Sequence, residues 1–338
     1  MNPPTEQQLG AAFRDLVAEQ PFTPDVSAIE HRARQARRHD RIVRGGIGAG
    51  VVAVAAGAAV GVASTVPSAP TPTAQASGVH PASTGASAST ARPGGTEPLA
   101  KLAAYVAAER RPAGDATLVE RKTGAPGSQA SINVWDLYAD NGQYFFSRTE
   151  AGLPVKVRKG DVEGEGIFGR EVAAATYAVT GDLHTAALKM AWAPDTSPVP
   201  AWLRAQVKDM KAGHQIANYV WENSEDALIA GSGNPQVRAG VLRLVSLLPD
   251  ITVTRGIVDG QPALTLTAGA AEIGNITGKP DKAYPKGRPG APLSEAITVN
   301  AHTGVPLQGT MAVGGKVVGT IRYVVTRVNL ADIAAGKF

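Results

Sequence analysis

The sequence contains no cysteine among its 338 residues. This absence excludes disulfides, thiolate metal ligands, a cysteine nucleophile and lipid attachment through an N-terminal cysteine. Any exported part of the chain must therefore be held together by packing and hydrogen bonds alone. Aromatic residues are also scarce, at 5% of the chain.

Charge is missing from one long stretch, because no Lys, Arg, Asp or Glu occurs between Arg44 and Arg92. Within it, residues 45–66 are only Gly, Ala, Val, Ile, Ser and Thr. As a helix they would span roughly the 30 Å hydrocarbon core of a bilayer. Residues 31–44, just before, carry six Arg against one Asp. This asymmetry predicts a transmembrane helix at 45–66, a cytoplasmic N-terminus, an extracytoplasmic C-terminal domain and a plasma-membrane location. The membrane-flanking residues are Arg37, Arg38, Arg41 and Arg44, facing an anionic inner leaflet.

Two alternatives to a retained span stay open. The first is a cleaved signal peptide, since Ala74-Gln75-Ala76 has the small-x-small pattern of a cleavage site. Against it, the apolar run exceeds the usual core of about 7–15 residues. The second is a buried soluble helix, which the six glycines of residues 45–66 disfavour.

The cytoplasmic tail, residues 1–44, has the pattern of two short helices. Its first helix would present one apolar face made by Leu9, Phe13, Leu16 and Val17. A segment this short cannot bury its own core. The face is therefore a candidate site for a cytoplasmic protein partner, although a tail that lies on the bilayer or is mostly disordered would explain it equally well.

Residues 67–97 are rich in Ala, Ser, Thr, Pro and Gly and predict a disordered linker. An extracytoplasmic domain then fills 98–338, long enough for one sizeable core. It should begin with a helix that Leu99, Leu102, Tyr105 and Val106 mark and that ends at Arg110-Arg111. Strands should follow at Ala116–Thr123, Ile132–Tyr138, Gln143–Arg148 and near Leu153–Val157, with an Asn141-Gly142 hairpin turn.

From about 166 to 249 the pattern becomes helical, and afterwards it returns to strands. The later strands should occupy Ile251–Val258, Ala263–Ala268, Ala296–Asn300, Pro306–Val313 and Val317–Val328, with turns at Asp259-Gly260 and Gly314-Gly315. Strands, helices and then antiparallel strands describe an α+β fold, in which a meander sheet carries an inserted helical segment.

Residues that could perform chemistry are sparse. His184, His214 and His302 lie far apart without metal-ligand spacing, and no Gly-x-Ser-x-Gly, HExxH or phosphate-loop motif occurs. Acidic residues alternate at 161–165 and cluster at 222–226, and both groups are typical of solvated surfaces. Ser232 is a weak nucleophile candidate, and the basic loop 278–290 could meet lipid headgroups but is typical of an ordinary loop. The four tryptophans, at positions 135, 192, 202 and 221, fit core packing. We expect no catalytic residue, cofactor or metal, no enzyme activity and no nucleic-acid partner.

The C-terminal half carries two stretches with a family resemblance. Asn234–Val253, followed by Asp259-Gly260-Gln261, and Ile297–Leu307 with its Asn300-Ala-His-Thr-Gly304 turn resemble a group of uncharacterised actinobacterial single-pass membrane proteins. The sequence departs from that pattern at Asp250, usually Gly, and at Asn300, usually Asp. Members look associated with extracytoplasmic-function sigma factors, and their exported domains look like distant relatives of the LolA/LppX/RseB half-barrel, a curved antiparallel sheet over helices. The motifs are structural, so they transfer no active-site residue.

The resemblance implies a non-enzymatic, membrane-anchored regulatory or sensory protein. Its exported domain would bind an apolar or protein ligand, and its tail would contact a cytoplasmic partner such as a sigma factor. The alternative is a lipid or lipoprotein carrier of the cell envelope with a lipid-like ligand. A cell-wall hydrolase and a module without any ligand are two further readings.

Overall fold

The computed structural model describes residues 96–124, 131–163, 166–210, 214–269 and 293–338. The predicted tail, the predicted span at 45–66 and most of the predicted linker lie outside these ranges. So do the partner-binding candidates Leu9, Phe13, Leu16 and Val17 and the four membrane-flanking arginines. Within the described ranges, no helix combines the length and the apolar character needed to cross a bilayer.

Eight antiparallel strands form one open sheet in the order β3-β2-β1-β8-β7-β6-β5-β4. Two meanders meet where β1 pairs with β8, so the first strand of the described chain lies beside the last. The α+β class and the antiparallel sheet are therefore confirmed. The strands are β1 (Ala116–Gly124), β2 (Ser131–Ala139), β3 (Tyr144–Ser147), β4 (Thr252–Val258), β5 (Gln261–Ala268), β6 (Leu293–Asn300), β7 (Pro306–Val313) and β8 (Lys316–Val328).

Glycine-containing turns fix the hairpins where the sequence predicts them. Asp259 and Gly260 have φ of 49° and 76°, so both turn residues adopt the left-handed conformation that suits a two-residue hairpin. Gly142 in the β2–β3 turn has φ of 88°, which favours glycine at that position.

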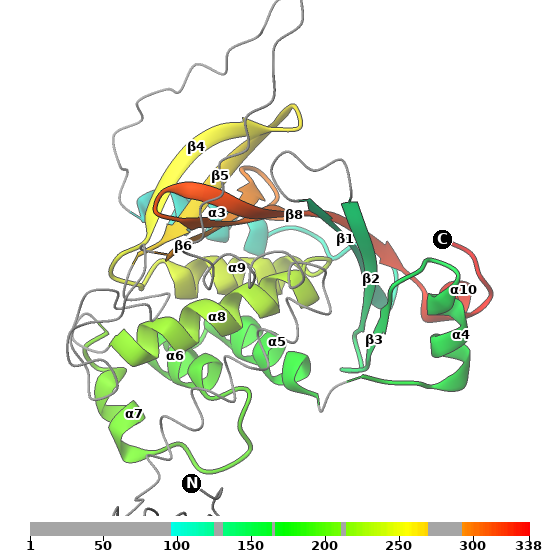
Figure 1. Ribbon diagram of the computed structural model, residues 1–338. Helices are drawn as coiled ribbons and strands as arrows, with labels where there is room; N and C mark the ends of the chain where they lie inside the picture. Colours follow the sequence, from blue (N-terminus) through cyan, green and yellow to red (C-terminus); the bar gives the residue numbers. More distant parts are fainter. Residues whose placement is uncertain (1–95, 125–130, 164–165, 211–213, 270–292) are drawn as a thin grey trace, which may run out of the picture. The chain divides into compact units, whose positions relative to one another are not determined.

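The helical segment connects β3 to β4, and several of its helices lie along one side of the sheet (Figure 1). Asp182 caps α6 by accepting a hydrogen bond from the Thr185 N–H at 2.8 Å. Asn234 caps α9 in the same way, with Pro235 at the first helical position. The helices are α3 (Glu97–Ala107), α4 (Gly152–Lys159), α5 (Ile167–Ala178), α6 (Leu183–Ala191), α7 (Ala201–Gln206), α8 (His214–Ala230), α9 (Pro235–Val245) and α10 (Leu330–Ala334).

The main core lies between these helices and the inner face of β4–β6. Trp221 of α8 and Leu242 of α9 are almost completely buried, as are Leu266 of β5 and Val299 of β6. The fit between helices is close: a Cβ added at Gly240 of α9 would lie 1.7 Å from the Ala175 carbonyl oxygen of α5. Glycine at position 240 therefore allows the backbones of α5 and α9 to touch.

The opposite face of β1–β3 is covered by α4 and α10 (Figure 1). The predicted strand at Leu153–Val157 is wrong, because this segment is helix α4. Val155 and Val157 alternate as in a strand, but Leu153 and Val157 also have the i,i+4 spacing of a helix. The helix ends at Gly160, whose left-handed φ of 63° is typical of a helix C-terminus.

Two further expectations need correction. Trp192 and Trp221 are buried, but Trp202 is 38% exposed and so is not a core residue. The acidic residues Glu222, Glu225 and Asp226 are half-buried instead of exposed, because α8 packs between other helices and contacts β1.

Candidate functional site

A buried ion pair lies on the face of β1 and β2 that α5 and α8 cover. Arg121 of β1 binds the Asp136 carboxylate of β2 through two hydrogen bonds, Nε–Oδ2 at 2.5 Å and Nη2–Oδ1 at 2.9 Å. Asp136 is fully buried, and the Arg121 side chain is 16% exposed. Burial would lower the pKa of Arg121, but the Asp136 carboxylate, together with Tyr138 and Tyr144, outweighs this effect, so that pKa is raised overall.

Aromatic rings surround this ion pair. The Tyr144 hydroxyl donates a hydrogen bond to Asp136 Oδ1 at 2.6 Å, and its ring stacks on Tyr138 with centroids 4.9 Å apart. Phe168 of α5 meets both rings edge to face. Burial, and next the negative charge of Asp136, raise the pKa of Tyr144 well above its ordinary value. The tyrosine therefore stays neutral and acts as a hydrogen-bond donor to the carboxylate.

Tyr323 of β8 lies on the same face of the sheet, near the acidic residues of α8. Its side chain is 7% exposed and packs with Val119, Tyr138 and Ala230. Burial, and after it the carboxylate of Glu225, raise the pKa of Tyr323. We name Arg121, Asp136, Tyr144 and Tyr323 the inner polar cluster.

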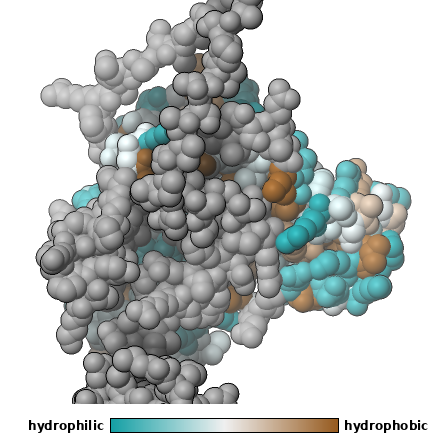
Figure 2. Space-filling model, viewed as in Figure 1, coloured by the Kyte–Doolittle hydropathy of each residue, from teal (hydrophilic) through white to brown (hydrophobic). Residues whose placement is uncertain are grey.

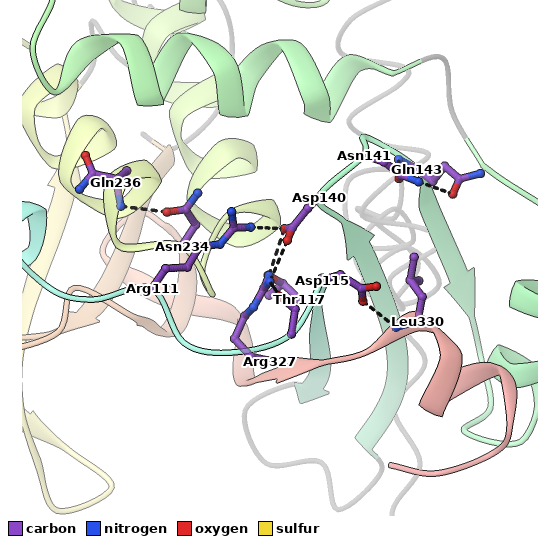
Figure 3. Close-up of polar contacts among 11 residues, drawn as sticks. Arg111, Asp115, Thr117, Asp140, Asn141, Gln143, Asn234, Gln236, Arg327 and Leu330 are labelled. Carbon is purple, nitrogen blue, oxygen red and sulfur yellow. Dashed lines mark hydrogen bonds and ion pairs between the residues drawn. The ribbon is translucent and has the colours of Figure 1, made fainter.

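A second arginine network joins the end of β8 to the start of the domain. Arg327 binds both oxygens of Asp140, at 3.1 and 2.9 Å, and donates to the Thr117 hydroxyl at 3.1 Å and to the Gly114 carbonyl (Figure 3). Arg111 pairs with the same Asp140 carboxylate. Gly233 in the α8–α9 loop packs against this arginine, since a Cβ there would lie 2.3 Å from Arg327 Cδ.

Arg238 of α9 forms a third network and is only 4% exposed. It donates to the Thr303 carbonyl at 2.7 Å, the Ser232 carbonyl at 2.6 Å and Glu109 Oε2 at 2.8 Å. Burial lowers the pKa of Arg238, and the Glu109 carboxylate opposes this effect. The three arginine networks thus connect strands, helices and loops that are far apart in the sequence.

Among the residues that the structure describes, those considered from sequence do not come together as a reactive site. His184 and His302 are exposed. The Ser232 hydroxyl is buried and donates to the Ile229 carbonyl at 2.8 Å. Asp161 and Glu163 share Lys156, at 3.7 and 2.5 Å. No group of three His, Asp or Glu suited to a metal ion occurs among the residues that the structure describes.

On the surface of the described ranges, exposed large hydrophobic side chains come from several different elements. Over α4 and α10, hydrophilic and hydrophobic residues are mixed on the visible face (Figure 2). Val155 is 39% exposed there and Phe338 53%. Ile257 of β4, at 76%, is the most exposed large hydrophobic residue of the described chain.

Sequence reasoning missed the inner polar cluster. Its members share one face of the sheet with buried apolar residues: Arg121 lies two positions after Val119 on β1, and Asp136 lies between Val134 and Tyr138 on the same face of β2. Opposite charges at inward positions of two paired strands are the signal that could have identified it. No protein-family model matches this chain, and no curated protein or solved structure shows significant similarity to it.

Proposed function

We propose that this chain is a non-enzymatic, membrane-anchored regulatory or sensory protein whose exported domain binds a protein ligand at its outer surface. In this proposal residues 45–66 anchor the chain and the apolar face of the tail contacts a cytoplasmic protein, such as an extracytoplasmic-function sigma factor. The curved half-barrel expected from the family resemblance is part of the same proposal.

One observation carries the preference for a protein ligand: the inner face of the sheet bears a buried ion pair beneath the helices. Arg121 and Asp136 occupy the side of the sheet where a carrier of the half-barrel type would hold an acyl chain. That position is already filled by the ion pair and by the packed rings of Tyr138, Tyr144 and Phe168, so an acyl chain could enter only by displacing them. The outer surface and the sheet edge are then the available binding regions.

Native mass spectrometry of the full chain, purified from membranes in mild detergent, tests the proposed ligand class. We expect the chain to retain no stoichiometric lipid after detergent exchange. A reproducible one-to-one lipid adduct would instead favour the alternative, a lipid or lipoprotein carrier.

The cytoplasmic half of the proposal has its own test. Asp substitutions at Leu9, Phe13 and Leu16 should abolish co-purification of a sigma factor with the full chain, because charge on the face prevents apolar burial. The matched control places Asp at Ala11 and Ala18, on the opposite side of the same predicted helix. Equal recovery of the same proteins with both sets would remove the tail face as a partner site.

A further inference from the structure

The two edges of the open sheet differ in how they are protected. Strand β3 has four residues, and its Tyr144 carbonyl accepts a hydrogen bond from the Glu163 N–H at 2.7 Å. Strand β4, at the other edge, has seven residues, contains no proline and pairs with β5 without a bulge. Among the described residues, no backbone hydrogen bond from outside the sheet reaches Thr252–Val258. Short strands, proline, bulges and charged side chains are the usual protections of a sheet edge, and of these β4 has only one charged residue, Arg255.

The register shows which backbone groups of β4 point outward. Ile257 pairs with Pro262, whose carbonyl accepts from the Ala301 N–H at 2.9 Å and so faces away from β4. In an antiparallel ladder both members of such a pair face away from each other. The N–H and C=O groups of Ile257, and by alternation those of Arg255 and Val253, therefore point to the free edge.

The side chains along this edge are open to a partner. Ile257 is 76% exposed, and Arg255 is also exposed. Within the described chain Arg255 makes no ion pair, and Asp259, in the turn after β4, pairs with Arg322 at 3.2 Å. A Cβ added at Gly256 would meet nothing within 4 Å. The free edge thus combines three outward backbone donors and acceptors with one apolar side chain and one positive charge.

We propose that an extended segment of a partner protein, with an acidic residue between two apolar ones, adds to the sheet as an antiparallel strand beside β4. This inference rests on the proposed function and names how its protein ligand would bind. Backbone pairing supplies general affinity, and alternate side chains supply selectivity. The acidic residue lies opposite Arg255, and an apolar residue lies opposite Ile257.

Arg255 also disfavours a second copy of this chain as the strand that pairs with β4. If two β4 strands paired over their full length about a two-fold axis, Arg255 would lie opposite itself. Like charges directly opposite each other destabilise a strand pair. The same arginine favours a foreign acidic strand.

The cysteine-free chain permits a direct test by disulfide trapping of full-length Gly256→Cys in detergent. The probe is N-acetyl-Val-Cys-Glu-Thr-Val-amide, which places its cysteine opposite position 256, a pair close enough for a disulfide, and its glutamate opposite Arg255. One comparison peptide carries Lys in place of Glu, and another carries an N-methyl group on the Glu nitrogen. The fraction of protein bound by each peptide in a glutathione buffer is measured by mass spectrometry.

We expect trapping of the Glu peptide to exceed that of both comparison peptides by about tenfold, the ratio for one lost hydrogen bond or one reversed charge pair. Adding Arg255→Glu should invert the preference toward the Lys peptide. The control is Lys316→Cys at the exposed start of β8, where the three peptides should be trapped equally. A circular-dichroism melt of each variant confirms that it folds.

Equal trapping of the three peptides at position 256, or the same discrimination at position 316, overturns the strand inference. If that occurs while native mass spectrometry still finds no bound lipid, the proposed function stands and the ligand binds elsewhere. If the peptides are discriminated but the chain carries a stoichiometric lipid, the proposed ligand class is the part that fails.

Discussion

Removing the Asp136 carboxylate tests how much the buried ion pair stabilises the fold. The Asp136→Ala substitution leaves the Arg121 guanidinium, 16% exposed, without its bidentate partner, and the Tyr144 hydroxyl without its acceptor. Breaking a buried ion pair by deleting one partner costs about 3–5 kcal/mol, because the remaining charge stays buried and uncompensated. For a domain of this size each kcal/mol lowers the melting temperature by about 2–4 °C. The expected loss is therefore about 6–20 °C.

The assay is thermal unfolding of the purified full chain, followed by circular dichroism. The double variant Arg121→Met with Asp136→Leu should recover most of the loss, because it removes both charges and leaves apolar side chains. The control is Glu97→Ala, which breaks the Lys101–Glu97 ion pair between side chains that are 76% and 77% exposed. Solvent screens this surface pair, so the melting temperature should not change. A loss at Asp136→Ala of no more than about 2 °C, or a double variant as unstable as the single one, would refute the reasoning.

Three further predictions concern stability. The pKa of Tyr144 is raised in the folded state, so its contribution to stability is complete below the unfolded pKa of about 10 and is lost as pH rises above it. In urea titrations, Tyr144→Phe should therefore lose less unfolding free energy between pH 10 and 11 than the unchanged chain. An identical loss in both proteins would contradict this. Gly240→Ala should lower the unfolding free energy measured in urea despite the better helix propensity of alanine, because its Cβ meets the Ala175 carbonyl oxygen. Gly169→Ala, whose Cβ has its nearest neighbour at 3.8 Å, should raise the unfolding free energy. Changes of the same sign in both variants would be evidence against the close α5–α9 contact. Arg327→Gln should speed hydrogen exchange at 114–117 and 138–142, because the Asp140, Thr117 and Gly114 contacts are lost. Unchanged exchange there would show that the Arg327 network does not stabilise these segments.

Local sequence patterns predict most strands and helices of the described chain. The segment β7, Pro306–Val313, was predicted with its exact bounds, because Gly304 and the Gly314-Gly315 turn delimit an apolar run. Helix α4 was predicted as a strand, since its eight residues fit both periods. Helix α10 is not predicted from the sequence, because five residues are too few to show helical periodicity. Tertiary packing stabilises this helix, since Ile333 is buried against β1 and β2.

The candidate sites depend on pairings that the sequence does not display. Arg121 and Asp136 are brought together by the β1–β2 register, and Arg327 reaches Thr117 because the last strand pairs with the first. Likewise, the free edge of β4 follows from strand order, since the same sequence in a central strand would have no outward backbone groups. The tail face and the span at 45–66 lie outside the described residues and stay predictions.

The central claim, a chain divided between two compartments by residues 45–66, is tested most directly by cysteine labelling in intact cells. Single cysteines replace Thr5 in the tail and the exposed Lys316 at the start of β8, and a membrane-impermeant maleimide is added before or after lysis. We predict labelling of Lys316→Cys in intact cells and of Thr5→Cys only after lysis. Labelling of both positions only after lysis, with the protein recovered in the soluble fraction, would contradict the account.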